Sequence, residues 1–278
     1  MIPPIASKFV AGETPAEAIE HVESLNEGDV KAILNLLGEH YEERPPADED
    51  AAAYVDLVED IAQSDVDACI SVKPSQIGLD VGADVFEENL ERIVSHADDH
   101  GVFCWIDMED HETTDVTLDA YESLATEYDG GVGVCVQANL KRTKEDLERL
   151  APLPGKVRLV KGAYDEPSSL AYKKKERVNE AYREYLEYMF EHFEGGIAVG
   201  SHDPEMIEYA TDLHDEYGTE FEIQMLMGVR EDAQFELADD YEVYQYVPYG
   251  GKWFSYFYRR AMERKENLLF ALRAIVGR

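Results

Sequence analysis

The chain has 278 residues, of which 45% are apolar and 31% are charged. This apolar content is sufficient for a large core and excludes a disordered protein. The 60 acidic and 25 basic residues give a formal net charge of −35, which argues against nucleic acids and anionic lipid surfaces as partners. No apolar stretch approaches the ~18 residues of a membrane-spanning helix, and the N-terminus lacks a signal-peptide pattern, so we expect a cytoplasmic protein.

The acidic residues are spread over predicted helix faces and loops and are not gathered in one tail. One interpretation is a surface that binds a cationic partner. We favour a surface adapted to high salt, as in a salt-loving microbe, because screening by salt suppresses the repulsion between like charges.

Short apolar runs alternate with longer amphipathic stretches along the chain. Most of these runs are β-branched or almost continuously apolar, which is typical of buried parallel strands. The eight predicted strands cover residues 31–37, 66–72, 102–106, 132–136, 157–160, 197–199, 221–226 and 241–247.

Helical patterns lie between the predicted strands. Asp84 and Glu87 resemble a capping box at the start of one helix, and Gly101 is suited to its end. Asp203 and Pro204 indicate an N-cap followed by a proline in the first turn of another helix. Further helices are predicted over residues 15–24, 178–193, 253–262 and 267–276.

Eight strand–helix units in about 250 residues predict a (β/α)8 barrel of the TIM type. We expect residues 1–29 to form a short N-terminal helical extension and residues 30–278 to form the barrel domain. The main alternative is an open doubly wound sheet, which would normally carry a glycine-rich fingerprint after its first strand. Leu36-Leu37-Gly38-Glu39-His40 is not such a fingerprint.

Barrel enzymes carry their chemistry at the carboxyl ends of the strands, and polar residues end nearly every predicted strand here. In strand order they are Lys73, Asp107 with Glu109, Gln137, Lys161, Ser201 with His202, Gln224, and Tyr246. Arg158 is expected to point into the barrel, where a guanidinium must be paired, and Asp107 is its natural partner. Such a pair is either structural or part of an active site.

Two longer motifs resemble those of the proline dehydrogenase family. The stretch 157–164, VRLVKGAY, is similar to the family's central motif, and 246–250 with 256–263, YVPYG and YFYRRAME, is similar to its C-terminal motif. Shorter matches follow in the right order at Ser71-Val72-Lys73-Pro74, Trp105-Ile106-Asp107-Met108-Glu109, Val136-Gln137-Ala138, His202-Asp203-Pro204 and Phe221-Glu222-Ile223-Gln224. The resemblance covers nearly the whole chain and is to the short, monofunctional form.

This resemblance implies a barrel flavoenzyme that oxidises L-proline to Δ1-pyrroline-5-carboxylate with FAD, the first step of proline catabolism. It also implies a membrane quinone as electron acceptor, with peripheral association at the inner face of the membrane. The protein would supply orientation and an electrostatic field, while FAD carries out the redox chemistry.

The resemblance also implies roles for individual residues. Asp107 and Arg158 would form the catalytic pair. The substrate would be bound by Lys73, Tyr246, Tyr256, Arg259 and Arg260. FAD would contact Met108, Gln137, Arg158, Lys161, Gly162, Ala163, Ser201, His202, Gln224 and Glu263. The chain departs from the family at Ser201, where threonine is usual, and at Asn139, where tyrosine is usual.

Three other functions stay open from the residues alone. A Schiff-base aldolase or lyase would use Lys161 or Lys73 as its nucleophile. A metal-dependent hydrolase would be built on Asp107, Glu109, His111 and His202, although this pattern is weak for a metal and the three cysteines lack metal-ligand spacing. A non-catalytic acidic binding protein would leave the polar strand ends unexplained.

Overall fold

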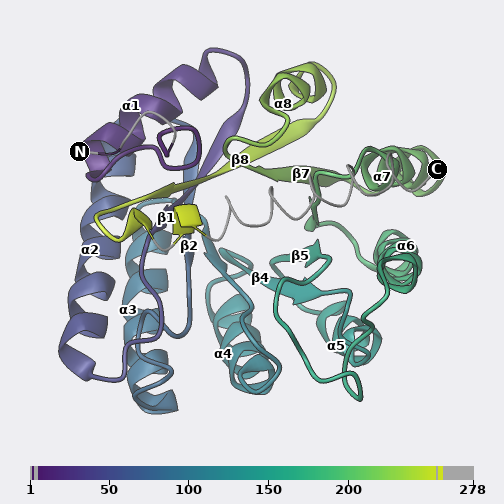
Figure 1. The fold of residues 1–278 in the computed structure, drawn as a ribbon, viewed down its shortest axis with the longest axis horizontal. Coiled ribbons are helices and arrows are strands. Elements are labelled where there is room, and N and C mark those ends of the chain that lie inside the picture. The colour runs from purple at the N-terminus through teal and green to yellow at the C-terminus, as the bar shows by residue number, and fades with distance from the viewer. Residues whose placement is uncertain (1, 3–5, 255, 259–278) are drawn as a thin grey trace, which may run out of the picture.

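The computed structural model describes residues 2, 6–254 and 256–258, and its sheet is a closed parallel barrel in which the strands follow one another in chain order (Figure 1). Pairing of β1 with β8 closes the barrel, which rules out the open doubly wound sheet and confirms the predicted (β/α)8 fold. The strands are β1 Lys31–Leu36, β2 Ala68–Val72, β3 Cys104–Ile106, β4 Val132–Gln137, β5 Lys156–Val160, β6 Ile197–Gly200, β7 Phe221–Leu226 and β8 Glu242–Tyr249.

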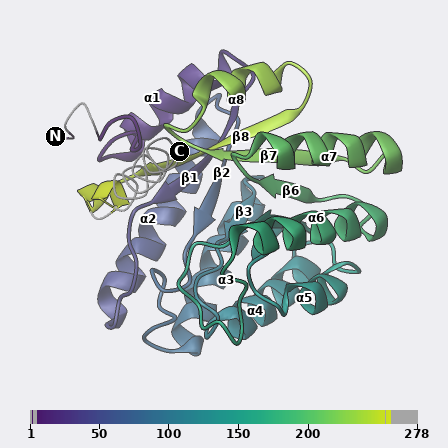
Figure 2. The ribbon, with the colours of Figure 1, turned by 45° about the vertical axis from the view of Figure 1, so that its right-hand side comes forward.

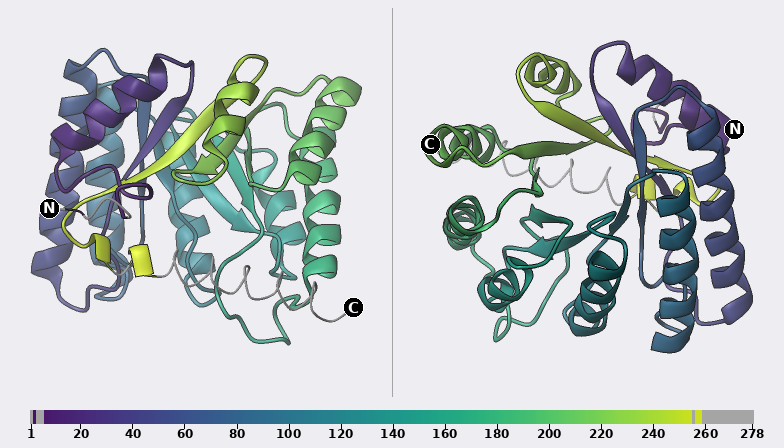
Figure 3. Two further views of the ribbon diagram at one scale, coloured as in Figure 1. Left: turned by 45° about the horizontal axis from the view of Figure 1, so that its top comes forward. Right: turned by 180° about the vertical axis from the view of Figure 1, so that it is seen from behind.

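Helices surround the strands, and α6 and α7 run side by side on the outside of the barrel (Figure 2). They are α1 Pro15–Asn26, α2 Arg44–Gln63, α3 Ala83–Asp99, α4 Thr114–Glu127, α5 Thr143–Leu150, α6 Lys175–His192, α7 Pro204–Tyr217 and α8 Glu231–Ala238. The first of them precedes the barrel and lies against β1 and β8 (Figure 3). Among the described residues, no helix is both long and apolar enough to cross a membrane.

Local sequence signals explain some of the helix ends. The predicted N-cap of α7 is confirmed, because the Asp203 side chain accepts a hydrogen bond from the backbone of Glu205. The capping box predicted at Asp84 is wrong. Gly82 is the N-cap of α3, and Asp84 lies in the first turn, where its charge favours the helix dipole. Gly101 follows this helix with φ +68°, as its conformational freedom suggests.

The described residues form a large apolar cluster between helices and strands, a second, small cluster around Phe9, Val10 and Leu37, and a third inside the barrel. The inner cluster consists of Ile33, Cys69, Trp105 and Ala198, against which Tyr246 packs. Because β1, β3 and β6 are not neighbours in the sheet, these side chains can meet only in the barrel interior. This apolar layer is thin, and charged side chains lie towards both ends of the barrel.

Candidate active site

The predicted ion pair between Asp107 and Arg158 is present inside the barrel. Asp107 directly follows β3, and the Nη2 atom of Arg158 on β5 donates to its Oδ1 atom. Arg158 is only 4% exposed, and its guanidinium carbon lies 4.9 Å from the ring centroid of Trp105. Alternate strands contribute side chains to one layer of a barrel, which is why residues from β3 and β5 meet at the same level.

Three further groups contact the Asp107 carboxylate. The Tyr246 hydroxyl donates to Oδ2 over 2.6 Å, the Ser71 hydroxyl donates to Oδ1 over 2.8 Å, and the Lys73 ammonium lies 3.4 Å from Oδ2. Burial alone would raise the pKa of Asp107, but Lys73 and Arg158 with these hydrogen bonds lower it to about 2. The carboxylate is therefore ionised at neutral pH, and two cations contact it directly.

Gln224, on β7, occupies the other side of Arg158. Its Oε1 atom accepts from Nη1 of Arg158 over 3.0 Å, and its Nε2 atom donates to Glu222 over 2.6 Å. Both ends of this buried amide are thus engaged within the chain. The flavin contact implied for Gln224 stays a prediction.

The ends of β5 and β6 bring together three of the residues predicted to bind a cofactor. The Lys161 ammonium lies 2.6 Å from a carboxylate oxygen of Asp203, and the Ser201 hydroxyl accepts from the backbone of Asp203 over 3.2 Å. The His202 Nε2 atom accepts from the backbone N–H of Leu226 over 3.4 Å.

A narrow position beside Lys161 explains the glycine of the central motif. Gly162 has φ +97°, and a Cβ atom there would lie 2.1 Å from Oδ1 of Asn139. That oxygen is buried and has no hydrogen-bond partner among the residues that the structure describes. A buried acceptor without a donor, next to a backbone that excludes a side chain, fits a ligand that brings its own N–H or O–H groups. Ala163, the next residue, is exposed.

Two other predicted cofactor residues lie at the ends of β3 and β4. Met108 is buried, and the Gln137 side-chain nitrogen donates to the backbone oxygen of Glu109 over 2.7 Å. The Glu109 carboxylate in turn accepts from the backbone N–H and the hydroxyl of Ser75, both over 2.7 Å. Burial raises the pKa of Glu109. The Glu109 carboxylate therefore fixes the loop after Lys73, and the Glu109 backbone oxygen fixes the side-chain amide of Gln137.

Comparison with known proteins identifies the family. The family model described as "Proline dehydrogenase" matches residues 18–273. The chain belongs to the proline dehydrogenase family. Proline dehydrogenase 1 of Bacillus subtilis subsp. natto is 34% identical over 276 residues, covering 98% of this chain and 90% of the relative. The proline dehydrogenase of Deinococcus radiodurans is 34% identical over 282 residues, with coverage of 98% and 90%.

Solved structures that resemble the chain carry the same fold. Proline utilization A (PutA) from Bdellovibrio bacteriovorus, inactivated by N-propargylglycine, superimposes with a TM-score of 0.85 at 23% identity. The match covers 92% of this chain and 32% of that one. PutA from Bradyrhizobium japonicum gives a TM-score of 0.75 at 20% identity, with coverage of 91% and 30%. The chain thus spans about a third of these PutA proteins, and the likeness concerns the barrel.

Membership of the proline dehydrogenase family decides against the aldolase and the metal-dependent hydrolase, and the contacts agree. Lys73 and Lys161 are both paired with carboxylates. Asp107 bonds to Arg158, Glu109 bonds to Ser75, and the His111 ring bonds to Glu166, so these groups serve separate partners.

Some of the predicted site residues lie away from the group around Asp107 and Arg158 or outside the described part of the chain. Tyr256 is buried in a second apolar cluster with Phe9, Val10 and Leu37. The remaining predicted site residues, Arg259, Arg260 and Glu263, and the helix predicted over 267–276 fall outside the described residues.

Sequence reasoning gave no positioning role to Ser71, Glu109 or Glu222, although each lies in a short motif, and it did not single out Lys156. Ser71 could have been found, because it lies two residues before Lys73 and alternation places both on the same face of β2. Glu222 precedes Gln224 by two residues on β7 in the same way.

Proposed function

We propose that this chain oxidises L-proline to Δ1-pyrroline-5-carboxylate by hydride transfer to FAD. Family membership supports the reaction. One observation supports an active site at the carboxyl end of the barrel. Lys73 and Arg158 both contact the single carboxylate of Asp107 at the carboxyl end of the barrel. This excess of positive charge suits an anionic amino acid beside a cofactor that becomes negative on reduction.

The substrate carboxylate would be bound by Lys73, with Arg259 and Arg260 as the implied partners. An ammonium and two guanidinium groups suit a carboxylate geometrically. Tyr246, whose hydroxyl donates to Asp107, would pack against the proline ring. The proline nitrogen must be neutral before the adjacent ring carbon can release a hydride.

The free acceptor of Asn139 and the close approach at Gly162 support a flavin at this end of the barrel. The residues that would hold it are Met108, Gln137, Arg158, Lys161, Gly162, Ala163, Ser201, His202, Gln224 and Glu263. FAD supplies a hydride acceptor when bound. Arg158 would stabilise the negative charge that develops, and Asp107 would keep the guanidinium in place. Trp105 excludes water from the inner side of the pair.

The reduced flavin must then pass its electrons to an acceptor. A membrane quinone is the acceptor we expect, reached by a cytoplasmic protein that associates peripherally with the inner face of the membrane. The acidic surface makes an extended anionic lipid contact unfavourable.

An absorption spectrum tests this function. Purified protein should be yellow, and L-proline added without oxygen should bleach the flavin band. Borohydride added with substrate should trap no covalent adduct on Lys73 or Lys161. A colourless protein that retains no added FAD, or a flavin that L-proline does not reduce, would contradict the proposal.

A further inference from the structure

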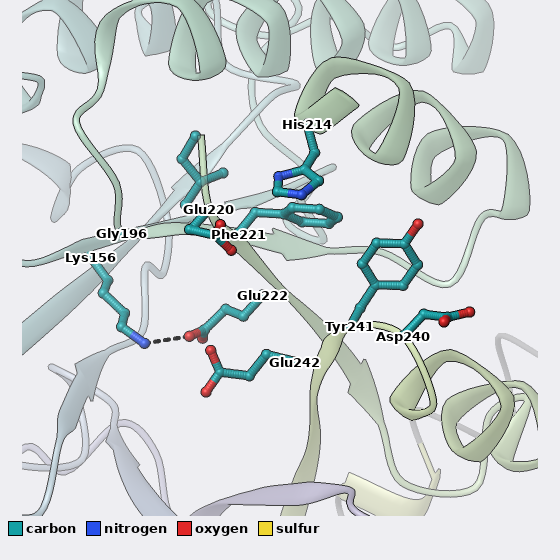
Figure 4. A pocket seen from close by; sticks show the side chains of 10 residues that line it. Lys156, Gly196, His214, Glu220, Phe221, Glu222, Asp240, Tyr241 and Glu242 are labelled. Atoms are coloured by element: carbon teal, nitrogen blue, oxygen red, sulfur yellow. Dashed lines mark hydrogen bonds and ion pairs between the residues drawn. The ribbon is translucent and has the colours of Figure 1, made fainter. Parts of the chain in front are cut away.

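A second group of charged side chains lies at the opposite end of the barrel. Lys156 on β5 and Glu222 on β7 form an ion pair at a cavity of 310 Å³ that Glu242 also lines (Figure 4). Glu222 is 2% exposed, whereas the side chain of Lys156 is 30% exposed. The pair lies at the amino ends of its strands, away from the residues assigned to substrate or cofactor.

A continuous chain of hydrogen bonds joins this pair to the active site. Glu222 accepts from Nε2 of Gln224 over 2.6 Å, and Oε1 of Gln224 accepts from Arg158 over 3.0 Å. Arg158 then donates to Asp107. β6 lies between β5 and β7, and its inward positions 198 and 200 are alanine and glycine, which lets Arg158 and Gln224 meet.

The chemistry of the end groups fixes the direction of this chain. A guanidinium only donates hydrogen bonds, and an ionised carboxylate only accepts them. The amide of Gln224 between Arg158 and Glu222 is therefore restricted to one orientation, with its oxygen towards Arg158. An amide in the reverse orientation would bring an NH2 group against the guanidinium.

We propose that Glu222 is a positioning residue for catalysis, acting through Gln224 to hold the Arg158 guanidinium in the orientation that faces Asp107. The inference rests on the proposed role of Arg158 in proline oxidation. Lys156 completes the arrangement, because burial raises the pKa of Glu222 whereas Lys156 and the amide of Gln224 favour its ionised form. Glu242 also faces Glu222, and it pairs with Lys31, which contacts Asp67 as well.

Glu222→Gln removes the acceptor-only end of the chain while keeping the size of the side chain. Gln224 then donates to a neutral amide in place of a carboxylate and holds Arg158 less firmly, and flavin reduction by L-proline should slow roughly tenfold to a hundredfold, the equivalent of one hydrogen bond to a charged group. The KM for proline should change little, because Lys73 is untouched. Glu242→Gln, which removes the same charge from the same cavity, is the matched control and should keep the wild-type rate.

A double variant separates positioning from stability. Glu222→Gln leaves Lys156 without its partner, and Lys156→Met with Glu222→Gln removes both charges. The double variant should recover melting temperature relative to Glu222→Gln and still reduce flavin slowly. Recovery of the wild-type rate in the double variant would show that Glu222 only neutralises Lys156 and would overturn the inference. An unchanged rate in Glu222→Gln would overturn it equally.

The inference can be judged even if proline fails to reduce the wild-type flavin, a result that would overturn only the proposed function. The free energy of unfolding would then be measured for Glu222→Gln in the wild-type and in the Arg158→Met backgrounds. Coupling through Gln224 predicts a clearly smaller cost when Arg158 is absent. Equal costs in the two backgrounds would show that Glu222 and Arg158 act separately.

Discussion

The two ends of the barrel interior hold similar charged groups in different balance. At the amino end, Lys156 pairs with Glu222, and Lys31 pairs with both Glu242 and Asp67, so each cation has at least one carboxylate of its own. At the carboxyl end, Lys73 and Arg158 share Asp107. Every cation of the first arrangement is matched by a carboxylate. In the second, two cations share the one carboxylate that they both contact, although the buried Glu109 also lies near Lys73.

This difference distinguishes charged groups that stabilise the fold from charged groups that can bind a ligand. A buried ion pair with matched charges gains little by binding a ligand, because its desolvation has already been compensated within the chain. A cluster in which two cations share one carboxylate can accept a further anion instead. The carboxylate of proline and the reduced flavin are both anionic, and both belong at the carboxyl end in our proposal.

The largest effect is expected from Arg158→Met. Arg158 would stabilise the charge that develops on the flavin, and the loss of one such preorganised donor costs about 2.7–4 kcal/mol of activation free energy, so flavin reduction should be slower by roughly 100-fold to 1,000-fold. Lys31→Met, the same kind of change at the amino end, should leave the rate unchanged. Stopped-flow reduction by L-proline measures both. Equal losses in the two variants would remove the distinction between the ends.

Lys73→Met should affect binding more than turnover. It removes the second cation of the carboxyl-end cluster, and a hydrogen bond to a charged group is worth about 1.5–3 kcal/mol, so KM for proline should rise roughly 10-fold to 150-fold. Steady-state kinetics with an artificial electron acceptor measures this change. A fall in kcat with KM unchanged would place Lys73 outside the substrate contact.

The free energy of unfolding at acid pH should report the lowered pKa of Asp107. Its pKa is lowered from 3.8 to about 2 in the folded protein. The ionised carboxylate therefore stabilises the fold above pH 4, and this contribution, about 2 kcal/mol, is lost as pH falls from about 4 towards 2. Denaturant unfolding of wild type and Asp107→Asn between pH 5 and 2 should show a steeper decline in the wild type. Parallel curves would contradict the depressed pKa.

The smallest effect is expected at the amino-end pair of Lys31 and Glu242. Both side chains are partly exposed, at 32% and 40%, so solvent screens their attraction. Lys31→Met should change the free energy of unfolding by at most about 1 kcal/mol. A larger loss, measured by urea unfolding, would mean that the Lys31 ion pair stabilises the fold more than its exposure to solvent indicates.

The sequence predicted the barrel and the central ion pair for clear physical reasons. Buried parallel strands require apolar runs at regular spacing, and the alternation of layers brings Asp107 and Arg158 together. The neighbours of Gln224 could not be predicted in this way. Which side chains meet across β6 depends on strand tilt and on the small residues at 198 and 200. Lys156 and Glu222 were missed because a charged residue near the start of a strand ordinarily faces solvent.

The central claim is that Asp107 and Arg158 act as one unit, and a double-mutant cycle tests it most directly. Asp107→Ala, Arg158→Met and the double variant would be compared with wild type by stopped-flow reduction of the bound flavin with L-proline. We predict a large loss in each single variant and little further loss in the double, because either change already destroys the unit. Losses that add in the double variant would show that the two residues work independently and would contradict the account.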